Sequence, residues 1–566
     1  MPFLKALSRV QPGIGLAGSI AVFGSRMSLS RRGTEVMSNA PCDGMPSRGH
    51  QPPGGVLMNI GNIPRRNAIQ YPDKTALVFE GERWTWRQFN SRINRLAQAL
   101  MGLGLQKGDK VAVLTENVPA IVEANYACAK TGIVFFPVMS RLFPDDIRQL
   151  VSLSDARVLI FHPDFRAVVE PMRPDVPKVE TFIQIGGDVP SWATSYEPFL
   201  QSGKDVEPDV EVLPDDVYCF ICTGGTTGVS KLAMLSHLNA LTAIHTSIGA
   251  MNITPDDVGL QVLPLFHVIQ NNCLHPLLAA GASVVLQHRF DAVQFMKAIH
   301  EEKVSIVIVV PPFLWSWIMA VPEAIAYDIT HVRIFATAAA TFPDELKRDV
   351  LKFMPKAKLL YVYGLTESSG GNAVLLHHDN TFRKSGAIGV PNPLLGYRIV
   401  DHRNEAVPPG EAGELLLKGP AVIRGYYKRD EETAATFVDG WLHTGDIVRE
   451  DGEGFLFFVD RLKDMIKTGG ENVFAKEVED ALLNHPKISE AAVFGLPDPQ
   501  WGEKIHAAVV LKPGMEATEE EVLSFGKEHL AGFKRPKAVH FIPMLPRNPS
   551  GKVLKHVLKK DFAEKK

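Results

Sequence analysis

The chain has 566 residues, more than one hydrophobic core normally supports, so we expect two or more domains. Hydrophobic residues make up 45% of it and charged residues 22%, as in an ordinary globular enzyme. The net charge of −3 gives no electrostatic reason to expect binding to nucleic acid or to a membrane surface.

The first 50 residues differ in composition from the rest of the chain. Lysines and arginines precede the first acidic residue, Glu35, with serines and small residues among them. This balance is typical of a transit peptide, and residues 13–24 weakly match a signal-peptide core. We favour the alternative, a poorly structured leader or a true start at Met37. The expected location is the cytoplasm, or the mitochondrial matrix if residues 1–36 are a transit peptide.

The five cysteines are few and odd in number. Cys219 and Cys222 have C-x-x-C spacing, but in a strand their side chains would point to opposite faces, and no second pair accompanies them. We therefore expect reduced core thiols in a reducing compartment.

From about residue 51 the sequence alternates between helical and strand patterns. Apolar residues at helical spacing predict a helix over about 86–102, and a second helix from its cap, Asn117, to about 131. Short apolar strands are expected at 111–114, 134–138 and 157–161. This repeated alternation predicts an α/β fold with a mainly parallel sheet covered by helices.

A glycine-rich loop follows an apolar strand at 217–222. The loop comprises Thr223, Gly224, Gly225, Thr226, Thr227, Gly228, Val229, Ser230 and Lys231. Glycines allow successive N–H groups to face one anion, while the hydroxyls and the lysine add donors and charge. The P-loop pattern does not fit, because Ser230 precedes Lys231. The loop indicates phosphate binding, with an ordinary glycine-rich turn as the alternative.

Three later segments are interpreted from their local pattern. A strand at 258–264 leads into His267, and a lone histidine at a strand end is usually structural. The uncharged segment 304–322 is interrupted by Pro311, so we expect a buried strand, a turn and a short helix rather than a membrane span. A strand at 333–340 ends in three alanines, small enough for a planar ring to approach.

The segment 363–367 comprises Tyr363, Gly364, Leu365, Thr366 and Glu367, at the end of a predicted strand. A tyrosine can stack on a purine, glycine permits close approach, and threonine can bind phosphate. A carboxylate can hold Mg²⁺, which takes one or two carboxylates plus phosphate oxygens. Alone, this segment would be an ordinary strand-end turn.

Two further segments contain charged residues at strand ends. The segment 441–446 ends in Asp446, which could accept hydrogen bonds from both hydroxyls of a ribose or could be a turn aspartate. The run 460–467 contains Arg461, Lys463 and Lys467 and would by itself be interpreted as a solvated loop.

The last hundred or so residues predict a separate small α+β domain, of a size that is common for domains. Helices are expected at 475–485 and 519–530, with strands at 488–496, 504–511 and 539–542. Near the end, a Pro-Ser-Gly turn precedes Lys552, which sets this lysine apart from the basic tail that follows.

Five of these segments, in this order, resemble the AMP-forming acyl-CoA synthetase family, which includes acyl- and aryl-CoA ligases, adenylation domains and luciferases. The family's usual loop reads Thr-Ser-Gly-Thr-Thr-Gly-x-Pro-Lys-Gly, and this chain departs from it at Gly224, Ser230 and Leu232. The first departure removes a hydroxyl, so the loop would depend more on backbone N–H groups. The match at 338–343 is partial, because Ala338 and Thr341 replace the usual residues.

The resemblance, which extends over about 51–560, implies a domain organisation. A poorly structured leader (1–50) would precede a large N-terminal AMP-binding domain (51–460) of helix-covered, mainly parallel sheets. A hinge at 461–463, centred on Lys463, would then join it to a small mobile α+β domain (464–566).

The resemblance also implies roles for individual residues. The catalytic residues would be Lys552, Thr366 and Glu367, with Glu367 as the Mg²⁺ ligand. The residues expected to bind ATP or coenzyme A are Thr223, Gly224, Gly225, Thr226, Thr227, Gly228, Lys231, Ala339, Tyr363, Gly364, Asp446, Arg461, Lys467, Gly469, Gly470 and Asn472. The pocket for the acid would be lined by His267, Val309, Pro311, Ala339 and Gly364.

The implied reaction has two halves: a carboxylate attacks the α-phosphate of ATP, and the thiol of coenzyme A then attacks the acyl-adenylate. ATP, Mg²⁺ and coenzyme A are the expected cofactors. We expect a medium- or long-chain fatty acid, with an aromatic or alicyclic acid as the alternative. A ligase that loads a carrier protein also stays open, whereas Lys552 and Glu367 argue against a regulator without catalysis. We expect no nucleic-acid partner and no transmembrane segment, and a homodimer stays open.

Overall fold

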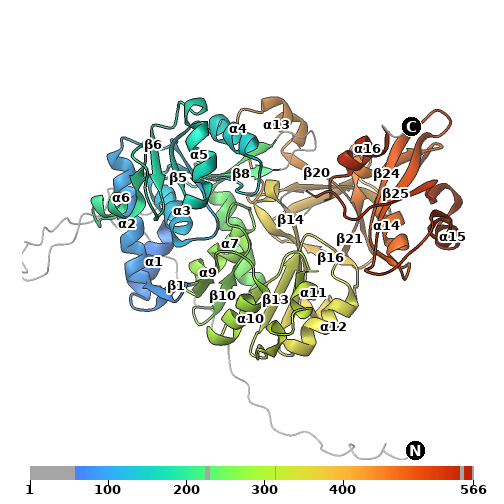
Figure 1. Cartoon of the computed structure of the whole chain (residues 1–566), viewed down its shortest axis with the longest axis horizontal. Coiled ribbons are helices and arrows are strands. Elements are labelled where there is room, and N and C mark those ends of the chain that lie inside the picture. Colours follow the sequence, from blue (N-terminus) through green and yellow to red (C-terminus); the bar gives the residue numbers. More distant parts are fainter. Residues whose placement is uncertain (1–57, 224–229, 313, 548–552, 564–566) are drawn as a thin grey trace, which may run out of the picture. The chain divides into compact units, whose positions relative to one another are not determined.

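The computed structural model describes residues 58–223, 230–312, 314–547 and 553–563. The predicted leader, the loop residues 224–229 (Gly224, Gly225, Thr226, Thr227 and Gly228 among them) and Lys552 lie outside the described residues. The α/β architecture expected from the sequence is confirmed, with an antiparallel extension that the strand–helix alternation did not indicate (Figure 1).

Among the described residues, the first sheet has seven strands in the order β7-β6-β5-β3-β4-β8-β9. They are β3 (Lys110–Leu114), β4 (Val134–Pro137), β5 (Ala156–Phe161), β6 (Thr181–Gln184), β7 (Thr194–Ser195), β8 (Val217–Thr223) and β9 (Lys231–Ser236). Neighbouring strands are parallel except β8 and β9, which are antiparallel with Thr223 opposite Lys231. The glycine-rich loop therefore connects two antiparallel strands, unlike a P-loop, which leads from a strand into a helix.

The second sheet has fourteen strands within the described part of the chain. Its parallel portion runs in the order β1-β11-β10-β12-β13-β14, with β2 at the edge. These strands are β1 (Thr75–Phe79), β2 (Glu82–Thr85), β10 (Val258–Gln261), β11 (Ser283–Leu286), β12 (Ile306–Ile308), β13 (Ile334–Ala338) and β14 (Lys358–Leu365).

The same sheet continues as antiparallel strands in the order β15-β16-β21-β20-β18-β17, with β19 paired to β20. They are β15 (Gly370–Leu376), β16 (Ala387–Pro391), β17 (Gly396–Val400), β18 (Ala412–Lys418), β19 (Phe437–Val438), β20 (Trp441–Glu450) and β21 (Leu456–Arg461). The turn predicted at 451–452 lies between β20 and β21. This extension places β14 in the same sheet as β20 and β21.

Helices form layers between and outside the two sheets (Figure 1). One apolar core joins the facing sides of both sheets through α1 (Asn62–Gln70), α2 (Trp86–Gly102), α3 (Pro119–Thr131), α7 (His237–Met251), α8 (Gln270–Cys273) and α9 (His275–Ala280). The outer face of the first sheet packs against α4 (Pro144–Ser154) and α5 (Arg166–Met172). The second sheet packs against α10 (Ala292–Glu301), α11 (Leu314–Met319) and α12 (Asp344–Phe353). Two further helices are α6 (Tyr196–Ser202) and α13 (Asp430–Thr436).

Local sequence signals explain several helix starts, with one correction. Thr85 and Ser236 cap α2 and α7 with reciprocal capping boxes. Asn117 was expected to cap α3, but that helix begins at Pro119, with Val118 as its cap residue. Pro119 needs no capping partner for its nitrogen. The Asn117 amide instead donates to the carbonyl of Leu263 and accepts from the N–H of Leu265.

The segment 304–322 forms β12 and the short helix α11, as predicted. Among the described residues, no helix is both long and apolar enough to cross a membrane. The described cysteines are buried and free; Cys219 packs in the core between the sheets and Cys222 in the outer core, so their opposite orientation is confirmed.

The small C-terminal part has its own sheet and its own apolar cores. It contains β22 (Ile466–Thr468), β23 (Glu471–Val473), β24 (Ile488–Asp498), β25 (Gly502–Leu511), β26 (Ala538–Phe541), α14 (Ala475–Leu483), α15 (Glu519–His529) and α16 (Lys555–Ala563). The 3₁₀ helix η6 (Leu462–Asp464) connects β21 to β22. The helices and strands expected in this part are therefore all present.

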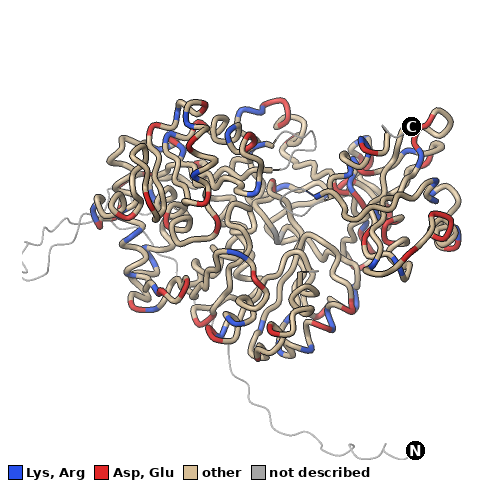
Figure 2. Tube along the Cα trace, viewed as in Figure 1, with Lys and Arg blue, Asp and Glu red and all other residues tan. Residues whose placement is uncertain are grey.

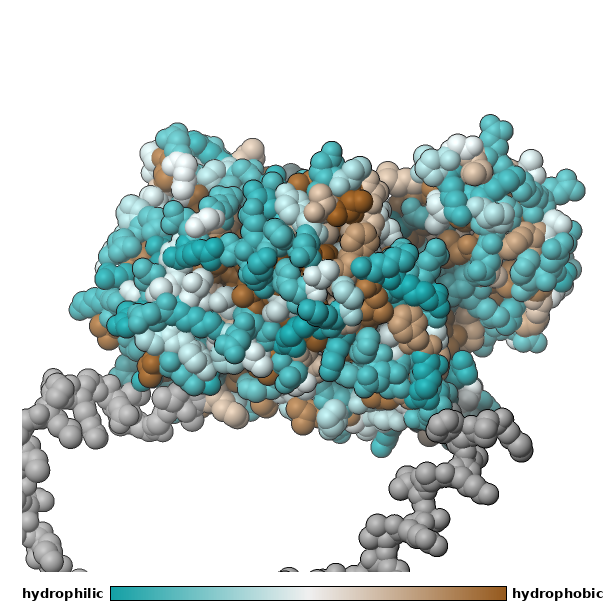
Figure 3. Space-filling view, turned by 90° about the horizontal axis from the view of Figure 1, so that it is seen from below, coloured by the Kyte–Doolittle hydropathy of each residue, from teal (hydrophilic) through white to brown (hydrophobic). Residues whose placement is uncertain are grey.

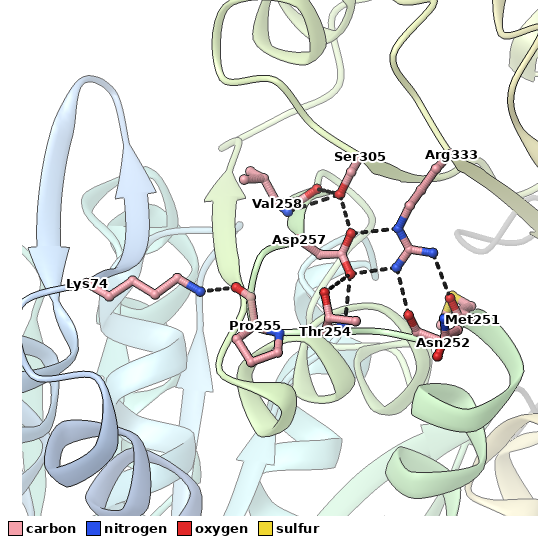
Figure 4. Close-up of polar contacts among 9 residues, drawn as sticks. All are labelled: Lys74, Met251, Asn252, Thr254, Pro255, Asp257, Val258, Ser305 and Arg333. Atoms are coloured by element: carbon pink, nitrogen blue, oxygen red, sulfur yellow. Dashed lines mark hydrogen bonds and ion pairs between the residues drawn. The ribbon is translucent and has the colours of Figure 1, made fainter.

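An ion-pair network fixes the beginnings of three parallel strands (Figure 4). Asp257, Ser305 and Arg333 directly precede β10, β12 and β13. Arg333 donates to both carboxylate oxygens of Asp257, at 2.7 and 2.5 Å, and Ser305 Oγ donates to Asp257 Oδ1 at 2.7 Å. Lys74 donates to the carbonyls of Pro255 and Gly281. The network thus anchors the edge of the sheet where these strands begin.

Charged residues of both signs are interspersed along the chain, in keeping with the small net charge (Figure 2). The face drawn in Figure 3 is mostly hydrophilic, with small separate hydrophobic areas.

Candidate active site

Tyr363 comes together with Asp446 and Arg461 although it lies 83 residues before Asp446 in the sequence. The Tyr363 hydroxyl on β14 donates to Asp446 Oδ2 on β20 at 2.6 Å. Arg461, at the end of β21, pairs in register with Asp446, and its Nε lies 3.4 Å from Asp446 Oδ1. Three segments that the sequence indicated separately therefore form one group.

Burial sets the protonation of this group. It raises the pKa of Asp446, and the Arg461 guanidinium partly opposes the rise. Burial, together with the neighbouring Asp446 carboxylate, raises the pKa of Tyr363 well above its ordinary value, so the phenol stays a hydrogen-bond donor. A carboxylate offers about four lone-pair positions, so Asp446 can accept further hydrogen bonds besides the one from Tyr363.

Glu414, which the sequence analysis missed, fixes the turn that presents Asp446. Its Oε1 accepts from the N–H of Gly445 at 2.9 Å, and its Oε2 lies 3.0 Å from His443 Nδ1. Gly445 has a φ of 69°, a conformation that favours glycine. The sequence held one signal for Glu414, an acidic residue directly before the apolar run 415–417.

Glu367 is held by a tyrosine from another segment. It lies in the 3₁₀ helix η4 (Thr366–Ser368), directly after β14. Its Oε1 accepts from the Tyr426 hydroxyl at 2.6 Å, and its carbonyl accepts from the N–H of Ile423 at 3.0 Å. Lys231 Nζ lies 4.9 Å from the centroid of the Tyr426 ring. Tyr426 thus links two of the predicted segments, and no sequence pattern pointed to it.

The chemistry of Glu367 suits a magnesium ligand. Its carboxylate is partly buried and is held by a neutral donor, because burial and the adjacent Glu367 raise the pKa of Tyr426. Mg²⁺ prefers oxygen ligands and needs few carboxylates when phosphate oxygens are also present. Thr366 adjoins Glu367 in the same 3₁₀ helix.

The expected adenine and pocket residues lie at the ends of three neighbouring parallel strands. Val309 and Pro311 follow β12, Ala339 follows β13, and Gly364 lies near the end of β14. Val309 is buried, whereas Ala339 and Gly364 are exposed. Ala339 has a φ of 70°, an uncommon conformation for a non-glycine residue. The structure therefore brings these predicted residues to one edge of the sheet.

His267 lies in a turn, and the preceding strand is shorter than predicted. β10 ends at Gln261, because the next backbone groups bond side chains: Leu263 O accepts from Gln261 Nε2 and from Asn117 Nδ2. His267 Nδ1 accepts from the N–H of Ile269 at 3.3 Å, which leaves the ring proton on Nε2. Burial lowers the pKa of His267, so it is a neutral donor.

The remaining predicted residues lie on the hinge segment and the small-domain sheet. Lys463 lies in η6, and Lys467, Gly469, Gly470 and Asn472 are exposed on the β22–β23 hairpin. Gly469 and Gly470 have φ values of 60° and 85°, as a tight two-residue hairpin turn requires. This hairpin belongs to a different sheet from Tyr363 and Asp446.

Backbone pairing joins the described residues on the two sides of 224–229 and of 548–552. Thr223 pairs with Lys231, and Arg547 pairs with Val553 in an antiparallel bridge. Lys555, just after that bridge, forms an ion pair with Glu479 at 2.7 Å.

Comparison with known proteins agrees with this geometry. A family model described as AMP-binding enzyme matches residues 64–427, and a model of the AMP-binding enzyme C-terminal domain matches residues 477–552. A feruloyl-CoA synthase from Amycolatopsis sp is 35% identical over 511 residues, which cover 89% of this chain and 99% of that protein. A long-chain-fatty-acid–CoA ligase from Mycobacterium tuberculosis is 34% identical over 511 residues, covering 90% and 99% of the two chains.

Solved structures give the same result. An anthranilate CoA ligase in complex with anthranoyl-AMP aligns with a TM-score of 0.82 at 25% identity, over 90% of this chain and 98% of that one. An O-succinylbenzoate coenzyme A synthetase from Bacillus subtilis, in complex with ATP and magnesium ion, aligns with a TM-score of 0.77 at 27% identity, over 88% and 99%. The group formed by Tyr363, Asp446 and Arg461 agrees with both family models and with the relatives. This chain belongs to the AMP-binding enzyme family and is an AMP-forming acid–thiol ligase.

Proposed function

We propose that the chain activates a hydrophobic monocarboxylic acid with ATP and transfers the acyl group to coenzyme A. The observation that carries this proposal is the convergence of Tyr363, Asp446 and Arg461 in one group, with Glu367 after the same strand as Tyr363. In this assignment Asp446 and Arg461 bind the ribose, and Tyr363, Gly364 and Ala339 surround the adenine.

The first half-reaction joins two negatively charged groups, so its barrier depends on positive charge. Lys231, the N–H groups of Gly224, Gly225 and Gly228, and the hydroxyls of Thr223, Thr226, Thr227 and Thr366 would hold the phosphates. Mg²⁺ at Glu367 would neutralise phosphate charge. Lys552 would stabilise the charge that builds at the α-phosphate as the acid oxygen attacks and pyrophosphate leaves.

The second half-reaction needs a different arrangement. The thiol of coenzyme A attacks the acyl carbon and AMP leaves, so a cation at the α-phosphate is no longer required. Rotation about Lys463 would withdraw Lys552 and present the hairpin with Lys467, Gly469, Gly470 and Asn472 to the thiol. The exposed glycines of that hairpin leave room for a narrow substituent.

For the acid we propose an aromatic ring with a polar substituent. Gln270 on α8, three residues after His267, is 2% exposed, and its Nε2 has no acceptor among the described residues. A buried N–H without an acceptor costs free energy, which a hydroxyl or methoxy oxygen on the substrate would recover. The names of the feruloyl and anthranilate relatives agree with this class.

A medium- or long-chain fatty acid is the second candidate. Its support is the apolar character of the expected pocket residues Val309 and Pro311 and the similarity to a long-chain-fatty-acid–CoA ligase. An alkyl chain would leave Gln270 Nε2 without an acceptor, which is why we place this class second.

A panel of acids assayed with ATP, Mg²⁺ and coenzyme A, with AMP release as the readout, tests the proposal. We expect ferulate and related hydroxylated aryl acids to have a higher kcat/KM than dodecanoate. Gln270→Leu should reduce the preference for ferulate over unsubstituted cinnamate by about tenfold, the usual scale for one hydrogen bond. A higher kcat/KM for dodecanoate would favour the second candidate. Release of pyrophosphate without AMP release or thioester formation would instead indicate a carrier-protein ligase, because no acceptor would then displace AMP from the acyl-adenylate.

A further inference from the structure

The segment 421–428, which we call the strap, contacts both β9, which begins at Lys231, and the turn after β14, which contains Glu367. The N–H of Met234 donates to Gly425 O, and the N–H of Tyr427 donates to Leu232 O, so the strap pairs with β9 directly after Lys231. The strap also contacts the turn after β14: Ile423 donates its N–H to Glu367 O, and Ser369 Oγ donates to Ala421 O at 2.7 Å.

Two adjacent tyrosines of the strap bind two different carboxylates. The Tyr426 hydroxyl donates to Glu367 Oε1 at 2.6 Å, while the Tyr427 hydroxyl donates to Asp155 Oδ2 at 2.8 Å. Asp155 follows α4, is also paired with Lys178 and Lys428, and belongs to no predicted site. The bonds are chemically alike, so the pair offers a control within the chain.

Burial and further contacts also hold the backbone and the ring of Tyr426 in place. The residue is 5% exposed, its N–H donates to Thr433 Oγ1 at 3.0 Å, and its ring packs near Phe437 at a centroid distance of 6.1 Å. A donor held in this way restricts the orientations open to the Glu367 carboxylate.

We propose that Tyr426 is a positioning residue that holds the Glu367 carboxylate in the orientation needed to bind Mg²⁺ with ATP. This inference rests on the proposed role of Glu367 as the magnesium ligand. Partners that orient a metal ligand typically contribute ten- to a hundredfold to metal affinity. The Tyr426 hydroxyl contacts the Glu367 carboxylate. In this proposal Tyr426 therefore affects Mg²⁺ binding by orienting that carboxylate and does not itself bind the phosphates.

The test measures ATP binding without the acid substrate, by calorimetric titration of the full-length chain in Mg²⁺ and in EDTA. Tyr426→Phe keeps the ring beside Lys231 and removes the hydroxyl. We expect its Kd for ATP to rise about tenfold in Mg²⁺ and to stay unchanged in EDTA. Tyr427→Phe should leave both values at the wild-type level, although each variant loses one bond to a carboxylate.

A third variant separates this inference from the proposed function. If Glu367→Gln loses the Mg²⁺ effect and Tyr426→Phe keeps it, the positioning role is wrong and the metal assignment stands. If Glu367→Gln keeps the Mg²⁺ effect, the metal assignment fails and the inference falls with it. An equal rise in Kd for Tyr426→Phe in Mg²⁺ and in EDTA would also overturn the inference, since it would assign the tyrosine to nucleotide binding in general.

Discussion

At the scale of single residues, Asp446 shows how burial and partners can favour a binding role over the alternative of a turn aspartate. It is 2% exposed, and both of its oxygens face groups from other strands. Asp451, which stands in the following turn, instead bonds the backbone N–H groups of Glu453 and Phe455 and the side chain of Lys384. Asp451 therefore stabilises a turn, whereas Asp446 joins side chains from two other strands.

Asp446→Asn should raise the KM for ATP about tenfold and reduce the preference for ATP over 2′-deoxyATP, because the charged acceptor that we propose for the ribose hydroxyls is lost. Burial raises the pKa of Asp446, so on acidification the wild-type KM for ATP should begin to rise at a higher pH than an ordinary aspartate would cause. Steady-state kinetics with both nucleotides between pH 5 and 8 measures these effects.

Asp451→Asn is the matched control, since it alters a turn in the same pair of strands. It should change thermal stability without changing the choice between ATP and 2′-deoxyATP. Unchanged discrimination in Asp446→Asn would remove the ribose role from this residue.

At the scale of elements, the two ends of the parallel strands carry different features: a stabilising ion-pair network at the beginnings and the candidate site at the ends. The network around Asp257 lies where β10, β12 and β13 begin (Figure 4). The candidate site lies where β13 and β14 end. Burial raises the pKa of Asp257, but hydrogen bonds from Arg333, Ser305 and the N–H of Thr254 outweigh it, so the pKa lies below its ordinary value.

Asp257→Asn should lower the Tm by several degrees and leave kcat/KM at 25 °C unchanged, because breaking a largely buried ion pair costs on the order of 3 kcal/mol. A carboxyl whose pKa is lowered by folding stabilises the protein above its unfolded pKa and loses that contribution as pH falls through the folded value. The Tm difference between wild type and variant should therefore shrink as pH falls from 6 toward 3, as scanning calorimetry can measure.

Asp256 is exposed and adjacent, so Asp256→Asn provides the control and should be nearly neutral. Equal Tm losses in the two variants would show that the Arg333 pair contributes little.

At the scale of the whole molecule, the sequence predicted what depends on local pattern. The apolar periods gave parallel strands such as β3, β4 and β5 and the helices α2 and α3, whereas β1, β6 and β11 were not predicted. The small domain was found element by element. The hydrogen bond from Tyr363 to Asp446 could not be predicted, because it requires β14, β15, β16, β21 and β20 to be ordered in space, and antiparallel order has no local signal. Tyr426 and Glu414 were missed for the same reason: their partners lie 59 and 31 residues away.

The domain boundary at 461–463 stays a prediction. The structure shows which elements meet at these residues. Arg461 still belongs to β21, and η6 covers Leu462–Asp464, so a change of direction would take place within a single short turn. Lys463 is exposed at its centre. Such a turn can absorb a rotation without breaking either flanking sheet.

Lys463→Pro should therefore leave adenylate formation nearly intact and slow thioester formation at least tenfold, because proline fixes its own φ and restricts the residue before it. Lys463→Ala removes the charge but leaves the backbone free, and should behave like wild type in both steps. Lys552→Ala should show the reverse pattern, with adenylation slowed about a hundredfold and transfer from preformed acyl-adenylate unaffected. Pyrophosphate exchange and single-turnover transfer to coenzyme A measure the two steps separately. If Lys463→Pro and Lys552→Ala impair both steps equally, then the small domain does not change position between the half-reactions, and one arrangement must serve both.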